Sequence, residues 1–155
     1  MAQGFTLITN LPAWTASLNT CAQRTESRIL QAAKKLVFDA LSGIIFKNPV
    51  KTGRSRAGWF VSVGEGTRTE ISPPRQRAYS NAGSVISRGQ SKANQAQSGQ
   101  AIWIYNNVDY IEALEFGRSR QAPQGMVRVT LSQLGGEERF SQAITHIIQQ
   151  EWEKS

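Results

Sequence analysis

Six arginines, arranged as three pairs with one residue between the members of each pair, are the residues of this sequence best suited to binding a charged partner. They are Arg54, Arg56, Arg75, Arg77, Arg118 and Arg120. A guanidinium group makes bidentate contacts to carboxylates and, equally, to phosphates. These arginines are therefore candidate contacts to an acidic surface of a neighbouring subunit or to a nucleic-acid backbone.

The positive charge of the chain is concentrated in its middle third. The 155 residues carry a net charge of +7, and the segment from Lys47 to Lys92 accounts for all of it with nine basic and two acidic residues. Such a segment is typical of contact with nucleic acid or with an acidic protein, although a solvated basic loop gives the same pattern. Tyr79 is the only aromatic residue between Phe60 and Trp103. Because bases then have little to stack on, we favour protein contacts over non-specific nucleic-acid contacts.

Residue patterns that could support catalysis or metal binding are scarce. The single histidine, His146, is expected on the exposed side of a helix, and the single cysteine, Cys21, makes neither a disulfide nor a zinc site. The remaining candidate is a cluster of three carboxylates, Asp109, Glu112 and Glu115. These could hold a cation, but ordinary pairing with Arg118 or Arg120 is the favoured interpretation. We therefore expect neither an enzyme nor a metal or cofactor site.

The pattern of apolar and turn residues predicts one α+β domain over residues 1–155, whose elements must position these side chains. Apolar residues spaced three and four apart predict a long helix that begins near residues 18–20 and ends at Asn48-Pro49. A second stripe, from Phe140 to Trp152, predicts a carboxyl-terminal amphipathic helix. The other predicted elements are a short helical turn or an irregular crossing within 108–116 and the strands of a small antiparallel sheet at 59–63, 101–105 and 126–131. Residues 132–134 could extend the last of these helically.

Other parts of the chain are expected to be extended or irregular. Residues 5–9 are β-prone, and residues 67–79 are expected to form a loop or an arm. In residues 80–100, 17 of 21 residues are Ser, Gln, Gly, Ala or Asn, which predicts a polar loop or arm that a neighbouring subunit would order. No apolar run is long enough to span a bilayer and no signal peptide is evident, so we expect folding in a cytosol without membrane contact.

Two blocks of the sequence carry a further pattern. The first block, residues 48–59, reads Asn48-Pro49-Val50-Lys51-Thr52-Gly53-Arg54-Ser55-Arg56-Ala57-Gly58-Trp59. The second block, residues 104–128, contains Ile104-Tyr105-Asn106-Asn107, Tyr110, Leu114-Glu115-Phe116-Gly117 and Ser119-Arg120-Gln121-Ala122-Pro123-Gln124-Gly125-Met126-Val127-Arg128. In this order the blocks resemble the tail-completion or head–tail joining (neck) proteins of long-tailed phages and prophages. The resemblance covers about residues 20–132, and the polar insert at 80–100 has no counterpart in it.

The resemblance implies a structural virion protein of the head–tail junction, which completes the tail and joins it to neighbouring neck or tail-tube rings. It implies a homo-oligomeric ring that assembles in the host cytoplasm, with neck, tail-terminator or tail-tube proteins as partners and non-specific contact with DNA in the channel left open. The alternative within this class is a tail-terminator or head-completion ring. The alternative outside it is a non-specific nucleic-acid-binding protein.

Two geometric expectations follow from the blocks. Gly53 and Gly117 each lie in a short turn beside large residues, so at least one should have a positive φ. Four arginines at the two blocks lie in loops beside strand ends and are expected to converge on one surface. They are Arg54, Arg56, Arg118 and Arg120.

Overall fold

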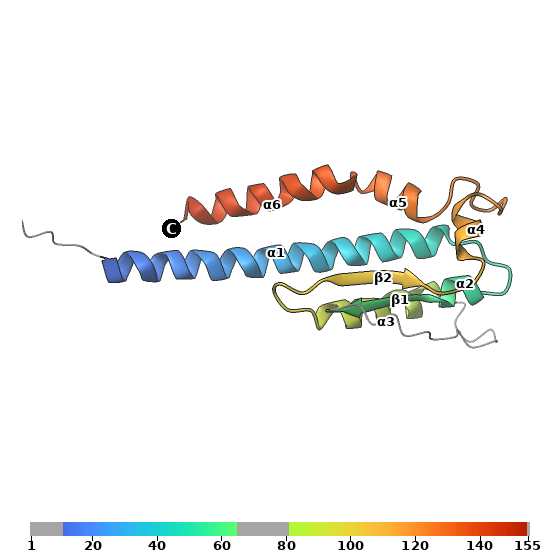
Figure 1. The fold of residues 1–155 in the computed structure, drawn as a ribbon, viewed down its shortest axis with the longest axis horizontal. Helices are drawn as coiled ribbons and strands as arrows, with labels where there is room; N and C mark the ends of the chain where they lie inside the picture. Colours follow the sequence, from blue (N-terminus) through green and yellow to red (C-terminus); the bar gives the residue numbers. More distant parts are fainter. Residues whose placement is uncertain (1–10, 65–80, 155) are drawn as a thin grey trace, which may run out of the picture.

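The structure is a computed structural model that describes residues 11–64 and 81–154 (Figure 1). Its elements, in chain order, are α1 (Leu11–Lys47), α2 (Arg54–Ala57), β1 (Trp59–Val63), α3 (Ala82–Asn94), β2 (Ile102–Asn106), α4 (Ile111–Glu115), α5 (Val127–Gln133) and α6 (Gly136–Trp152). The predicted α+β class is confirmed, with a long amino-terminal helix, a small antiparallel sheet and a carboxyl-terminal helix. Figure 1 shows α5 and α6 along one side of α1, and the sheet with α3 along the other.

The long helix α1 begins at Leu11, earlier than the apolar pattern predicted. Its 37 residues span about 55 Å. The buried stripe lies in the carboxyl-terminal half of the helix, at Ala40, Leu41, Ile44 and Ile45. The helix ends at Lys47 because a proline at position 49 disfavours helical geometry at the residue before it. Only this half of α1 is covered by the sheet and α3 (Figure 1).

The sheet has two antiparallel strands, paired from Trp59 opposite Asn106 to Val63 opposite Ile102. Both strands were predicted, β1 with the same bounds and β2 displaced by one residue. Trp59 and Val61 are buried in the main core, while a Phe60–Tyr105 ring pair, with centroids 6.0 Å apart, stacks on the other face. A two-stranded sheet is marginal alone, so its stability depends on this packing against helices.

The prediction of a polar loop or arm at 80–100 is wrong over the thirteen residues of α3. The inward-facing residues are small or apolar and repeat at helical spacing: Ala82, Val85, Ile86, Gly89 and Ala93. A Cβ at Gly89 would lie 2.3 Å from Cδ2 of the buried Leu41, so any larger residue would displace Leu41 where α3 packs on α1. The Asn81 side chain accepts the Gly83 N–H and caps the helix. The segment therefore packs on its own chain, and its composition no longer argues for ordering by a neighbouring subunit.

The prediction of a third strand at 126–131 is also wrong, because these residues lead into and form most of α5. Met126 and Thr130, four residues apart, are both buried, which is the periodicity of a helix. Three backbone N–H groups at the start of α5 are accepted by the carboxylate of Glu115. This tertiary contact selects the helix in a short segment whose alternating pattern fits a strand equally well.

The carboxyl-terminal helix α6 and the short helix α4 are confirmed. α6 lies along the amino-terminal half of α1, where the Cys21 thiol contacts the Glu151 carbonyl and Arg28 pairs with the Glu151 carboxylate. The predictions for residues 5–9 and 67–79 fall outside the described residues. Within residues 11–64 and 81–154, no helix has both the length and the hydropathy to cross a membrane.

Candidate functional site

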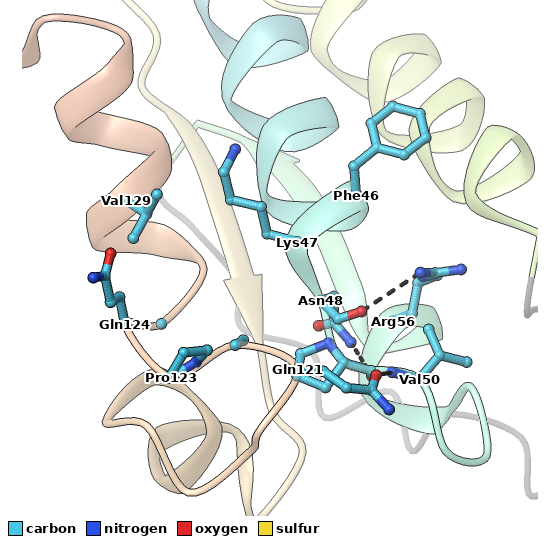
Figure 2. Close-up of a pocket in the computed structure, with 12 residues that line it drawn as sticks. Phe46, Lys47, Asn48, Val50, Arg56, Gln121, Pro123, Gln124 and Val129 are labelled. Carbon is cyan, nitrogen blue, oxygen red and sulfur yellow. Dashed lines mark hydrogen bonds between the residues drawn. The ribbon is translucent and has the colours of Figure 1, made fainter.

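The two blocks that carry the family resemblance meet at one end of the molecule. The Val50 N–H of the first block donates to the Gln121 side-chain oxygen of the second at 2.9 Å, as Figure 2 shows. The Asn106 side chain of the second block donates to the Ser55 carbonyl of the first at 2.8 Å. Residues far apart in the chain therefore build one surface, where α1 ends and α5 begins.

A buried asparagine, Asn48, organises the first block. Its side-chain NH₂ donates to the Pro49 carbonyl at 2.9 Å and to the Ser55 hydroxyl at 2.8 Å. Its side-chain oxygen accepts the indole N–H of Trp59 at 2.8 Å. Asn48, Ser55 and Trp59 are all buried, so these internal hydrogen bonds replace the ones that their polar groups would make to water in the unfolded chain. The amide thus fixes the end of α1 to α2 and β1.

A carboxylate, Glu115, organises the second block. It accepts the backbone N–H groups of Met126, Val127 and Arg128 at 2.7–2.9 Å, and the Arg128 side chain donates to it as well. Burial alone raises the pKa of Glu115, but these hydrogen bonds outweigh burial and hold that pKa below its ordinary value of 4.5. Glu115 therefore supplies the negative cap at the amino terminus of α5, from a residue outside that helix.

Both turn glycines that were singled out have positive φ, as predicted: 83° at Gly53 and 88° at Gly117. The second position is also closed to a side chain by space, because a Cβ at Gly117 would lie 2.5 Å from the Pro123 carbonyl oxygen. The loop over 117–125 is therefore held in one shape by its own backbone as well as by Gln121.

Two grooves flank the junction of the blocks. The smaller one, of about 480 Å³, lies between the loop after α1 and the loop before α5, and includes Asn48, Val50, Arg56, Gln121 and Pro123 (Figure 2). The larger one, of about 1170 Å³, is lined by four cationic side chains: Lys51, Arg54, Arg118 and Arg120. We call the larger one the basic groove.

The basic groove has little negative charge of its own. Asp109 lies 3.8 Å from Arg54 across an ion pair whose carboxylate is 78% exposed, and such a pair is weak in water. The Arg54 guanidinium also lies 5.9 Å from the centre of the Tyr110 ring, which holds it at the groove wall. Four cations around one solvated carboxylate leave a surface that suits an anionic partner.

The structure brings together three of the four block arginines that were expected to converge. Arg54, Arg118 and Arg120 line the basic groove. Arg56 instead borders the smaller groove, with Nη2 3.5 Å from the Asn48 carbonyl. The remaining two candidates, Arg75 and Arg77, lie outside the described residues.

Part of the basic segment serves the fold. Arg88, on α3, donates to the carbonyls of Ala57 and Trp59 and lies 4.3 Å from the Phe60 ring centre. Sequence reasoning counted Arg88 only as charge, and nothing in its local sequence signals this contact. It joins α3 to the outer side of β1, so its guanidinium is not part of the candidate surface.

The carboxylate cluster separates in the structure. Asp109 pairs with Arg54 and Glu115 with Arg128, so the predicted pairing with Arg118 or Arg120 is wrong. In the parts of the chain that the structure describes, no three His, Cys, Asp or Glu side chains are grouped to hold a metal ion. His146 is exposed, as expected, and contacts Gln150 on the same helix.

Comparison with known proteins adds no assignment: no family model, curated protein or solved structure matches this chain.

Proposed function

We propose that this chain is a structural protein of the phage head–tail junction, which completes the tail and joins it to neighbouring neck or tail-tube rings. In this role it acts as a ring-forming virion component assembled in the host cytoplasm, with no catalytic residue and no cofactor. A tail-terminator or head-completion ring is the nearest alternative position within the same assembly.

One observation supports this proposal most. The residues that carry the resemblance are the ones that build the junction: Asn48, Ser55 and Trp59 in the first block, with Glu115 and Gln121 in the second. These contacts fix α2 and the loop before α5, and these two segments present Arg54, Arg118 and Arg120 around one groove. A rigid, cationic and exposed surface suits docking onto an acidic face of a neighbouring ring.

The test reverses the charge of the basic groove in the full chain. The triple variant Arg54→Glu/Arg118→Glu/Arg120→Glu should fold normally, because exposed charges contribute less than about 1 kcal/mol each to stability. We expect heads and tails to accumulate unjoined when this variant replaces the wild-type chain in the phage that encodes it. Electron microscopy counts joined particles directly.

The matched control reverses two exposed arginines outside the groove, Arg24→Glu and Arg139→Glu. The control should give normal particles. Normal particles from the triple variant, or equal loss with the control, would contradict docking through the basic groove.

A second function, non-specific nucleic-acid binding, is favoured by the same four cations. It predicts that the wild-type chain retards DNA in a gel at about 0.15 M salt and that the triple variant does not. Retardation lost in the triple variant and kept in the control, with head–tail joining unaffected, would select this function over the structural one.

A further inference from the structure

An apolar groove of about 460 Å³ lies between the core-facing side of the sheet, α1 and the α5–α6 segment, and Trp59 of β1 lines it together with Ile102 and Ile104 of β2. Its floor is α1, around Val37 and Ala40; β2 supplies one wall, and Leu131 of α5 with Phe140 of α6 supplies the other. One charged residue, Glu137, lines it. Leu131 is 48% exposed, so this wall presents apolar surface to solvent in a single copy of the chain.

The backbone of β2 is unpaired on its edge away from β1, and the two residues whose groups point outward there also line the groove. Gly64 donates its N–H to the carbonyl of Ala101, so by the register Ser62–Trp103 and Phe60–Tyr105 are the hydrogen-bonded pairs. In an antiparallel pair the residues between them point their N–H and C=O groups outward. For β2 these are Ile102 and Ile104, and within residues 11–64 and 81–154 no backbone group bonds to them.

The two edges of the sheet differ in this respect. On β1 the outward carbonyl of Trp59 accepts Arg88 of α3 at 2.8 Å. On β2 the equivalent groups stand beside apolar side chains with room for another segment. An open edge next to an apolar groove is the geometry that binds an extended peptide by adding a strand.

The sequence contains one segment suited to this place. Residues 5–9, Phe-Thr-Leu-Ile-Thr, are uncharged and β-prone, with Phe5 and Leu7 on one side of an extended chain and Ile8 on the other. The other segment outside the described residues, 65–80, carries three arginines and two glutamates, and burying such charges in an apolar groove is costly.

Distance along α1 prevents this segment from reaching the groove of its own chain. Phe5 precedes Leu11, the first residue of α1, by six residues, which reach at most about 21 Å when extended. The groove begins at Leu36, roughly 38 Å further along the helix. Residues 5–9 can therefore reach this groove only from another molecule.

We propose that residues 5–9 of a second copy of this chain bind in the apolar groove and add a third strand to the free edge of β2. Each copy then gives one segment and receives one, which is the heterologous contact from which closed rings are built. This contact needs only the chain itself, so it holds or fails independently of the head–tail role.

Cross-linking of the purified full-length chain tests the proposal. Two variants are made in a Cys21→Ser background, one carrying Leu7→Cys and the other Leu131→Cys, and they are mixed under oxidising conditions. We expect a disulfide-linked dimer on a non-reducing gel, several-fold more abundant than the dimer formed when His146→Cys, exposed on α6, replaces Leu131→Cys. Ile8→Cys should give a yield different from that of Leu7→Cys, because neighbouring residues of a strand face opposite sides.

Three results would overturn the proposal. The first is a dimer yield no higher than that of the His146→Cys control. The second is an intramolecular cross-link in one chain that carries both Leu7→Cys and Leu131→Cys. The third is the same closure in a chain carrying Thr67→Cys and Leu131→Cys, which would assign the groove to the chain's own 65–80 segment.

Discussion

The two halves of α1 lie in different surroundings. Around the carboxyl-terminal half, α3, the sheet and α5 enclose Leu41, Ile44 and Ile45 in the main core. The amino-terminal half has α6 as its principal neighbour, and large apolar side chains such as Trp14 and Trp152 remain more than half exposed. Apolar side chains are exposed at both ends, since Phe46 in the carboxyl-terminal half is 69% exposed, but only the first region has a buried core that can be stable in one chain.

The difference also extends to polar groups. The core end places the Asn48 amide in a buried network and the Glu115 carboxylate on three backbone N–H groups. At the other end, which we call the helical-hairpin end, α6 packs on the amino-terminal half of α1. There the Glu151 carboxylate pairs with Arg28 and Lys154, whose side chains are both partly exposed. Buried hydrogen bonds therefore hold the loops at one end, whereas an ion pair with partly exposed cations joins the two helices at the other.

The largest expected difference concerns core truncation. Ile45 is fully buried and Ile148 is 47% exposed, so the same change tests both regions. Ile45→Ala should lower the free energy of unfolding by about 2–5 kcal/mol, and Ile148→Ala by less than about 1 kcal/mol. Urea unfolding measures both values. Equal losses would contradict a core confined to one end.

The next effect concerns the buried amide. Asn48→Ala leaves the Trp59 indole N–H without its acceptor and should cost about 1–3 kcal/mol. Adding Trp59→Phe removes that donor, so the double variant should lose less stability than the sum of the two single variants. Strict additivity would show that the Asn48–Trp59 hydrogen bond does not couple the two residues.

The carboxylate cap of α5 predicts a smaller effect that depends on pH. Glu115→Gln should lower stability at neutral pH by about 1–2 kcal/mol, because an uncharged amide is a weaker acceptor for three N–H groups. Since folding lowers the pKa of Glu115, its contribution is present above pH 4.5 and is lost as the pH falls below that value. Lowering the pH below 4.5 should therefore reduce the free energy of unfolding of the wild type more than that of the variant. Parallel pH profiles would contradict this role.

The smallest effect is expected at the helical-hairpin end. The hydrogen bond from Arg28 is the main cause that lowers the pKa of Glu151. Glu151→Gln should speed amide hydrogen exchange in the last turns of α6 and leave global unfolding almost unchanged, with exposed Glu153→Gln as the control. Added salt should accelerate the same exchange in the wild type, because it screens the ion pair. Faster exchange in the main core would contradict the separation of the two ends.

Several elements were predictable because their signals are local. The repeats of three and four in α1 and α6, the aromatic and β-branched runs of β1 and β2, and the proline at 49 act within a few residues. The positive φ at Gly53 and Gly117 followed from turn composition in the same way. The arginines of the basic groove were found by residue type, and three of the four arginines that were expected to converge do so.

Tertiary structure decided what local signals leave open. In α3, polar composition suggested a loop, yet Gly89 and the small residues at helical spacing pack against Leu41 and Val61. The helix is stabilised by this contact with α1 and β1, which the local sequence does not reveal. In α5, the strand-like alternation was overridden by Glu115, because a cap from another element stabilises backbone groups that the sequence of the helix cannot satisfy by itself. Arg56 does not join the other arginines of the expected surface, because its side chain contacts the Asn48 carbonyl, and Arg88 likewise binds backbone carbonyls after folding. The sequence thus determined which segments are helical or extended where the preference is strong, while packing and hydrogen bonds between distant residues decided the ambiguous segments and the direction of the charged side chains.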